Sequence, residues 1–246
     1  MSRPRTEATH RCLIIVPTFN EAASVGELVG AVFHSLPDTD VLVVDDASPD
    51  GTAGIVQRLV EGDGRVHLLR RPGKLGLGSA YVAGFSWGLA RDYQRFFEMD
   101  ADLSHDPRYL PAFLSALDAG ADVVVGSRNM PGGRVEGWGP LRHLISKGGS
   151  WYSRWVLGAR VRDMTTGFKA YTRRALERID VASLMTSGYA FQIETTYRAL
   201  RAEMKVVEVP IVFVDRRVGQ SKMRAADIAE AVVAPLKMRW NGRASG

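Results

Sequence analysis

The stretch "EMDADLSHDP" (98–107) carries two aspartates, Asp100 and Asp102, separated by a single alanine. They close an apolar run, 95–100, which predicts a buried strand, so the pair is expected where that strand meets its loop. Residues i and i+2 of a strand point to the same side, so these carboxylates can converge on one point. Converging carboxylates repel each other unless a cation joins them, and such oxygen ligands suit Mg²⁺ or Mn²⁺. The sequence therefore predicts a divalent metal site at Asp100 and Asp102, with a diphosphate as the partner of the metal.

The elements that must position this pair alternate regularly along the first half of the chain. Short apolar runs predict strands, and the stretches between them have the spacing of amphipathic helices. Such alternation favours a mostly parallel, Rossmann-like α/β sheet with helices on both faces. The predicted strands are 12–17, 40–46, 65–69, 95–100, 121–127 and the stretch 205–214, and the predicted helices are 21–36, a segment ending near 60, 77–91, 107–117, 141–158, 187–203 and 225–239.

In an open parallel sheet, ligands bind beyond the carboxyl ends of the strands. The residues at those ends are 17–21, 45–46, 100–102 and 127–128, and three of these four segments contain acids. His105 could add a ligand to the metal, but a lone loop histidine is more often solvated, so it is left out. The position of the acids supports a metal and phosphate site more strongly than the triplet alone does.

The glycine-rich stretch "GKLGLGSA" (73–80) has neither dinucleotide-binding nor P-loop spacing, and it follows the third predicted strand rather than the first. A Rossmann dehydrogenase and a P-loop NTPase are therefore not supported. The stretch is expected either to present backbone N–H groups to an anion or to form a simple tight turn.

The composition sets the class of protein. The chain has 246 residues, 46% of them hydrophobic, and a single cysteine, so an intracellular setting is expected. Residues 1–120 carry 11 Lys and Arg against 16 Asp and Glu, whereas residues 121–246 carry 21 against 11. The basic half could face a nucleic acid, a phosphate or a lipid surface, or many of its charges could simply keep helix faces soluble. We expect a single domain over 11–240, a disordered tail at 1–10 and a C-terminal tail at 241–246.

Aromatic and basic residues are interleaved in 138–157, "WGPLRHLISKGGSWYSRWVL". This pattern suits a helix at the surface of a bilayer, but it also fits a core helix with exposed charges. The last predicted helix allows the same two interpretations, and Pro235 is expected to bend or break it. No apolar stretch is long enough to predict a membrane span.

Eight motifs occur in an order that resembles the polyprenyl-phosphate mannosyltransferases, the dolichol-phosphate mannose synthase type of family 2 glycosyltransferase. The resemblance extends over about 11–224. The motifs are "IIVPTFNEAASV", "VLVVDDASPDGT", "GKLGLGSAYVAGF", "FFEMDADLSHDP", "VVVGSRNMPGG", "TTGFKAY", "GYAFQIE" and "VGQSKM".

The resemblance implies a GT-A fold and a set of donor-binding residues. The implied donor contacts are Pro17, Phe19, Glu21, Val44, Asp46, Asp100, Ala101, Asp102, Arg128, Arg216 and Lys222, of which Asp102 and Arg216 are the implied catalytic residues. Phe19 stands where many relatives have tyrosine. The phenylalanine ring can still stack on a base, but it lacks the hydroxyl that could form a hydrogen bond. Gln192 in "FQIE" stands where relatives that glycosylate hydroxyls carry an acid, which fits an acceptor that needs no base.

The implied reaction is metal-dependent, inverting transfer of mannose from GDP-mannose to a polyprenyl phosphate. Transfer of glucose or another sugar from a UDP donor is the alternative. We expect a peripheral enzyme on the cytoplasmic face of the membrane, with a separate membrane protein as a possible anchor. A nucleic-acid-binding protein is disfavoured because acidic strand ends repel phosphates, and a non-catalytic lipid-surface adaptor because the acids and Arg216 are intact.

Overall fold

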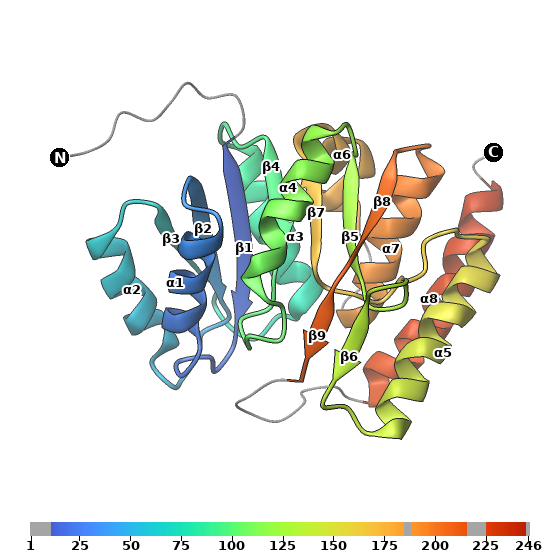
Figure 1. Cartoon of the computed structure of the whole chain (residues 1–246), viewed down its shortest axis with the longest axis horizontal. Helices are drawn as coiled ribbons and strands as arrows, with labels where there is room; N and C mark the ends of the chain where they lie inside the picture. The colour runs from blue at the N-terminus through green and yellow to red at the C-terminus, as the bar shows by residue number, and fades with distance from the viewer. Residues whose placement is uncertain (1–10, 185–187, 216–224, 245–246) are drawn as a thin grey trace.

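The computed structural model describes residues 11–184, 188–215 and 225–244. A central sheet in the order β3-β2-β1-β4-β7-β5-β8 is covered by helices on both faces, and β6 and β9 form a separate pair (Figure 1). This confirms the predicted α/β fold. The strands are β1 (Cys12–Thr18), β2 (Thr39–Asp45), β3 (Val66–Arg70), β4 (Arg95–Glu98), β5 (Val123–Ser127), β6 (Arg134–Glu136), β7 (Lys169–Thr172), β8 (Val206–Pro210) and β9 (Val212–Val214).

Two hydrophobic clusters lie on the two faces of this sheet. Strand β1 contributes Ile14 to one cluster and Ile15 to the other, because successive side chains of a strand point to opposite faces. The first cluster is covered by α1 (Val25–Ser35), α2 (Thr52–Gly62) and α4 (Leu110–Asp118), and the second by α3 (Leu77–Leu89), α6 (Arg173–Ile179) and α7 (Gly188–Arg201). Two single turns of 3-10 helix, η1 (Pro107–Tyr109) and η2 (Val181–Ser183), complete the smaller elements.

Strand β7 was not predicted, and it changes the centre of the sheet. It pairs antiparallel with both β4 and β5, whereas the other strand pairs are parallel. The strand has only four residues and opens on a lysine, so it lacks the apolar run that identified the other core strands. Helix α6 and strand β6 are similarly short and were also missed.

The loop after β1 is tied to the loop after β2. Glu21 donates its backbone N–H to Thr52 Oγ1 (3.0 Å), and Ala22 donates to Asp50 Oδ2 (3.0 Å). Helix α1 begins at Val25 rather than at the predicted residue 21, so residues 21–24 belong to this loop. From β1 the chain runs outward to β3 and then returns to β4 on the other side of β1. The carboxyl ends of β1 and β4 therefore flank the point where the strand order reverses, which is where open sheets bind ligands.

Helices α5 (Pro140–Leu157) and α8 (Ala225–Ala244) lie side by side at the β8 end of the molecule (Figure 1). The Tyr152 hydroxyl donates to the backbone carbonyl of Val232 (2.8 Å) and joins the two. Helix α8 continues through Pro235 to residue 244, so the proline does not break it, and residues 241–244 of the expected C-terminal tail are helical. The expected tail at 1–10 lies outside the described residues. None of the helices described here has the length and apolarity needed to cross a membrane.

Candidate active site

Asp100 and Asp102 lie in a turn just beyond β4, which ends at Glu98. They lie where the strand meets its loop, as expected, but the strand ends earlier than the predicted residue 100, and Leu103 has a left-handed backbone (φ 62°), so the chain has already turned. Asp100 Oδ1 accepts a hydrogen bond from the Tyr81 hydroxyl (3.2 Å). Asp102 is nearly buried, and its Oδ1 accepts from the backbone N–H (3.1 Å) and the hydroxyl (2.5 Å) of Ser104. Both carboxylates thus have fixed orientations.

His105 supports this turn from inside the protein. The backbone N–H of Asp100 donates to Nδ1 of the imidazole (3.1 Å), and the ring stacks on Phe168 at 4.9 Å. Burial lowers the pKa of His105 to about 4, so the ring is neutral at neutral pH. The expectation that this histidine is solvated is wrong, because it is buried and holds the Asp100 backbone in place.

A buried polar layer lies beneath the turn and joins β4, β7 and α7. The Tyr171 hydroxyl donates to Glu98 Oε1 (2.9 Å), and Lys169 Nζ donates to the backbone carbonyl of Gln192 (2.6 Å). Burial lowers the pKa of Lys169 to about 8 and raises that of Glu98, which shows how little water reaches this layer. Strand β7 therefore supplies the cation that lies opposite Glu98.

The next strand end, at β2, places Asp46 against the glycine-rich loop. Asp46 Oδ2 accepts the backbone N–H of Leu75 (3.1 Å), and Oδ1 lies 3.2 Å from Arg71 Nε. Burial raises the pKa of Asp46, although Arg71 opposes that shift. The Leu75 N–H is used within the protein, so at this position the loop acts as a turn fixed by a carboxylate. Lys74 Nζ lies 4.3 Å from the centre of the Phe19 ring, at the mouth of the same region.

The other predicted donor contacts at these strand ends have different surroundings. Pro17, in β1, and Glu21 are half-buried, whereas the side chain of Val44 is fully buried in the core. Val44 is paired with strands on both sides, so it offers no exposed surface to a ligand in this structure. Ala101, in the aspartate turn, is also buried. Arg216 and Lys222 lie outside the described residues, so their roles remain predictions.

Arg128, just after β5, is held by a buried acid. Its Nε and Nη2 donate to the two carboxylate oxygens of Asp163 (2.7 and 2.8 Å), and Nη2 also donates to Thr165 Oγ1 (3.0 Å). Burial alone would raise the pKa of Asp163, but the charge and hydrogen bonds of Arg128 outweigh it, and the pKa lies below its ordinary value. Glu208 of β8 in turn accepts the backbone N–H of Asp163 (3.1 Å). The guanidinium is therefore fixed in one orientation.

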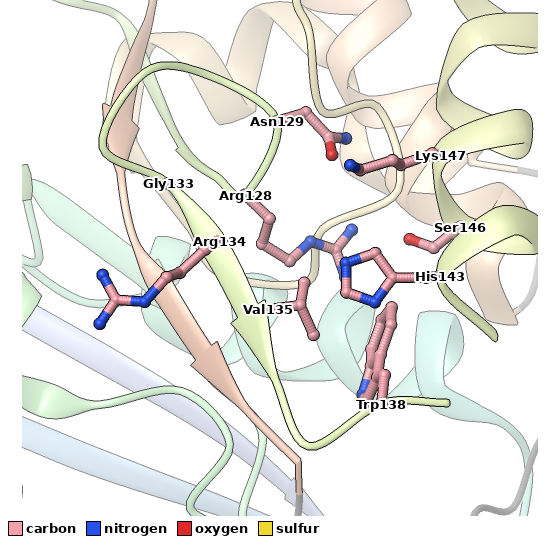
Figure 2. Close-up of a pocket in the computed structure, with 9 residues that line it drawn as sticks. All are labelled: Arg128, Asn129, Gly133, Arg134, Val135, Trp138, His143, Ser146 and Lys147. Carbon is pink, nitrogen blue, oxygen red and sulfur yellow. The ribbon is translucent and has the colours of Figure 1, made fainter. Parts of the chain in front are cut away.

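Arg128 also opens onto a pocket between the β5–β6 segment and α5 (Figure 2). In Figure 2, the guanidinium of Arg128 and the imidazole of His143 point toward each other, while the Lys147 amine points toward Asn129. Arg134 points away and pairs with Glu136 (2.7 Å). Among the residues that the structure describes, no Asp or Glu lines this pocket, which suits an anion. The lining residues are Arg128, Asn129, Gly133, Arg134, Val135, Trp138, His143, Ser146 and Lys147.

Aromatic rings connect this pocket to the aspartate turn. The Phe213 ring lies 5.5 Å from His105, 5.3 Å from Trp138 and 5.6 Å below the guanidinium of Arg128. The carboxylates that could hold a metal and the cationic pocket are therefore neighbours, separated by one layer of side chains.

The model of the family described as "Glycosyl transferase family 2" matches residues 13–180. The chain belongs to this family. It is 47% identical over 236 residues to the polyprenol monophosphomannose synthase of Mycolicibacterium smegmatis, covering 96% of this chain and 89% of the relative. It is 46% identical over 236 residues to the undecaprenyl-phosphate mannosyltransferase of Micrococcus luteus, covering 94% and 97%. These relatives confirm the predicted resemblance and show that the protein is a glycosyltransferase.

The fold of this glycosyl transferase matches that of solved structures. Glucosyl-3-phosphoglycerate synthase from Mycobacterium tuberculosis, in complex with Mn²⁺, UDP-glucose and phosphoglyceric acid, superposes with a TM-score of 0.69 at 18% identity, covering 95% of this chain and 81% of that one. The same enzyme with Mn²⁺, UDP and phosphoglyceric acid gives a TM-score of 0.70, covering 94% and 79%. At this identity the likeness confirms the GT-A fold alone.

Gln192 lies close to the aspartate turn of this glycosyl transferase. It occupies the position at which the family resemblance implies an acid in relatives that glycosylate hydroxyls. A Cβ at Gly167 would lie 3.7 Å from Asp100 Oδ1 and 3.5 Å from Gln192 Nε2, so the loop brings these two side chains close together. The amide of Gln192 is buried, and it interacts with the Glu98 carboxylate, where it opposes the rise in the pKa of that acid. Glu194 instead pairs with Arg198 (2.6 Å), one helical turn away. The neutral side chain therefore lies close to the aspartate turn, and the acid has a structural partner.

Several site residues of this glycosyl transferase were missed in the sequence. Tyr81 and Asp163 carry no local signal, because each acts on a residue of another element. Trp138 and Lys147 were noted only as membrane contacts, although both line the pocket. The only available signal for His143 was its spacing of four residues from Lys147, which places both on one face of a helix.

Proposed function

We propose that this glycosyltransferase transfers mannose from GDP-mannose to a polyprenyl monophosphate, with inversion at the anomeric carbon and release of GDP. The observation that carries the proposal is the cationic, acid-free pocket beside the aspartate turn, which suits an anionic acceptor next to a nucleotide-sugar donor. The names of both relatives, a polyprenol monophosphomannose synthase and an undecaprenyl-phosphate mannosyltransferase, support the acceptor and the sugar.

The donor would bind over the carboxyl ends of β1, β2 and β4. Phe19 offers a ring for the base, and Asp46 offers a carboxylate to the base or ribose. Beyond β4, Asp100 and Asp102 would face the diphosphate. Arg216 and Lys222 remain proposed phosphate contacts. This placement follows the rule that ligands of open sheets bind where the strand order reverses.

A Mg²⁺ or Mn²⁺ ion fits the aspartate turn, because Asp100 and Asp102 are hard oxygen donors held by hydrogen bonds. Within the described residues no group of three or more His, Cys, Asp or Glu could hold a metal. Diphosphate oxygens would therefore complete the coordination, so metal and nucleotide bind together. When bound, the ion neutralises the charge that develops on the departing diphosphate. The solved neighbour with Mn²⁺ is consistent with this choice.

The acceptor phosphate would lie in the pocket of Figure 2. One of its oxygens attacks the anomeric carbon of mannose as the bond from that carbon to the GDP β-phosphate oxygen breaks, and the bonding electrons leave with GDP. A phosphate monoester is already anionic near neutral pH, so no proton has to be removed. The neutral Gln192 close to Asp100 agrees with a reaction that needs no carboxylate base.

The outer face of α5 would place the enzyme on the membrane that holds the lipid. Leu144, Trp151 and Trp155 recur at helical spacing along α5 and are strongly exposed, with Trp151 at 66% and Trp155 at 71%. Exposed tryptophans next to cations favour the headgroup region of a bilayer. We place the enzyme on the cytoplasmic face, where a separate membrane protein could anchor it.

The first test is sugar transfer from radiolabelled GDP-mannose and UDP-glucose, in parallel, to a short polyprenyl phosphate in detergent, with Mg²⁺ or with EDTA. We expect labelled mannose to be incorporated into the lipid from GDP-mannose with Mg²⁺, and we expect EDTA to abolish this incorporation. Incorporation from UDP-glucose alone would overturn the sugar and base assignment. Absence of transfer from both donors, in detergent and again after membranes are added to the Mg²⁺ reaction, would contradict the proposed activity.

Asp102→Asn should lower transfer at least about a hundredfold, because it removes a charge from the proposed metal and diphosphate site. Titration calorimetry with GDP and Mn²⁺ should show that the added metal no longer tightens nucleotide binding. Asp118→Asn is the matched control, since Asp118 pairs with Arg95 far from the turn. Metal-dependent GDP binding that survives in Asp102→Asn would remove Asp102 from the metal site.

A further inference from the structure

His143 lies in the cationic pocket, yet nothing in the proposed reaction has used its imidazole. Figure 2 shows its ring beside the guanidinium of Arg128, and Trp138 approaches it edge-on at 5.9 Å. Ser146 and Lys147 follow three and four residues later, so all three side chains share one face of α5. No hydrogen bond or ion pair to the imidazole occurs within the described residues.

The charges around His143 are mostly matched inside the protein. Asp163 neutralises Arg128 (2.7 Å), Asp215 pairs with the neighbouring Arg142 (2.7 Å), and Arg134 turns away to Glu136. Lys147 has no carboxylate partner in the described part of the chain. Counted over the described residues alone, the surroundings of the imidazole therefore carry about one unmatched positive charge when it is neutral and two when it is protonated.

This count matters because two kinds of phosphate compete at a membrane. A lipid monophosphate carries about −1.5 to −2 charges at neutral pH, since its second pKa is near 6. The phosphodiester headgroups of ordinary phospholipids carry only one charge on the phosphate and are in large excess. An imidazole ordinarily gains or loses its proton between pH 5 and 8, so it can supply the second positive charge when a dianion arrives.

We propose that His143 is a further contact of the acceptor phosphate, which takes up a proton as the ligand binds and so selects a phosphate monoester over a phosphodiester. This inference rests on the proposed placement of the acceptor in the pocket. With a monoester, the two unmatched charges of Lys147 and protonated His143 meet two negative charges. With a diester, a proton on His143 would have no second negative charge to pair with. The neighbouring cations would then disfavour protonation. The pocket would thereby distinguish a doubly charged phosphate monoester from the singly charged phosphodiesters of the surrounding membrane.

The test is binding, so it does not depend on transfer. Titration calorimetry at pH 7.5 would use farnesyl monophosphate in detergent, in two buffers of different ionisation enthalpy, with the full chain. Wild-type protein is expected to take up a substantial fraction of one proton per ligand, and His143→Gln to take up almost none. His34→Gln is the control, because His34 is exposed on α1, and it should behave as wild type.

The second arm measures selectivity with a ligand of the same chain and one charge less, the methyl ester of farnesyl monophosphate. Wild type is expected to prefer the monoester, and His143→Gln to lose about tenfold of that preference, the size of one charge-assisted hydrogen bond. Equal proton uptake by wild type and His143→Gln, or unchanged selectivity, would overturn the inference. Normal proton-linked binding by a protein that transfers no sugar would instead contradict the proposed function and leave the inference standing.

Discussion

At the scale of single residues, the site depends on groups that orient the chemistry without providing it. His105 holds the backbone of Asp100, and Asp163 holds the guanidinium of Arg128 from two sides. Both supports are buried, so their charge states are set by the protein interior rather than by water. Losing such a support should change stability as well as ligand binding.

Asp163→Asn should lower the free energy of unfolding at pH 7 by about 3 kcal/mol, because it leaves Arg128 buried without its counter-charge. The pKa of Asp163 is lower in the folded protein than in the unfolded chain, so its stabilisation is present above about pH 4 and is lost as the pH falls further. The difference between wild type and variant should therefore shrink below pH 4. Urea unfolding at pH 7 and pH 3.5 measures both values, and a gap that is constant with pH would contradict this account.

At the scale of elements, α5 serves two surfaces at once. One face carries His143, Ser146 and Lys147 toward the pocket, and another exposes Leu144, Trp151 and Trp155. The alternative that these two tryptophans belong to the core is therefore wrong. An acceptor with a charged head and an apolar tail could lie along such a helix, with the head in the pocket and the tail in the bilayer.

Replacing Trp151 and Trp155 together by alanine should weaken binding to liposomes and leave the free energy of unfolding within about 0.5 kcal/mol of wild type, because both rings are exposed. GDP binding should not change. The double phenylalanine variant is the matched control and should retain most of the liposome affinity, since it keeps apolar aromatic rings. Undiminished cosedimentation of the alanine variant with liposomes would move the membrane contact to another face.

At the scale of the whole molecule, the two halves of the chain are interlocked through the sheet. Strands β4 and β5 do not pair with each other but are joined by β7, which comes later in the chain than both. Beneath the aspartate turn, Lys169 of β7 also compensates the buried Glu98. The site therefore cannot be completed before the second half of the chain has joined the sheet.

A fragment of residues 1–160 contains the first five predicted strands, yet it should not fold. Without β7, strands β4 and β5 lose their shared partner and expose backbone groups that must be hydrogen-bonded. Far-ultraviolet circular dichroism should show no cooperative thermal transition for the fragment, whereas the full chain should show one. A fragment that melts cooperatively would mean that the amino-terminal half is an independent unit.

The sequence by itself determined the α/β class, the alternation up to β5 and the acids at the strand ends. These features are local, because apolar periodicity and strand-end position can be read from neighbouring residues. The eight motifs were sufficient to indicate the family that the comparisons confirm.

Only the tertiary structure decided which residues act together. Three features join segments that are separated in the chain. They are the pairing of Arg128 with Asp163, the insertion of β7 between β4 and β5, and the position of His143 opposite Arg128. Only the tertiary structure also decided exposure. The sequence allowed Trp151 to lie at a membrane surface or in the core, and His105 to be a metal ligand or a solvated residue. Long-range packing sets which side chain meets which partner and which loses its water, and no local pattern encodes that choice.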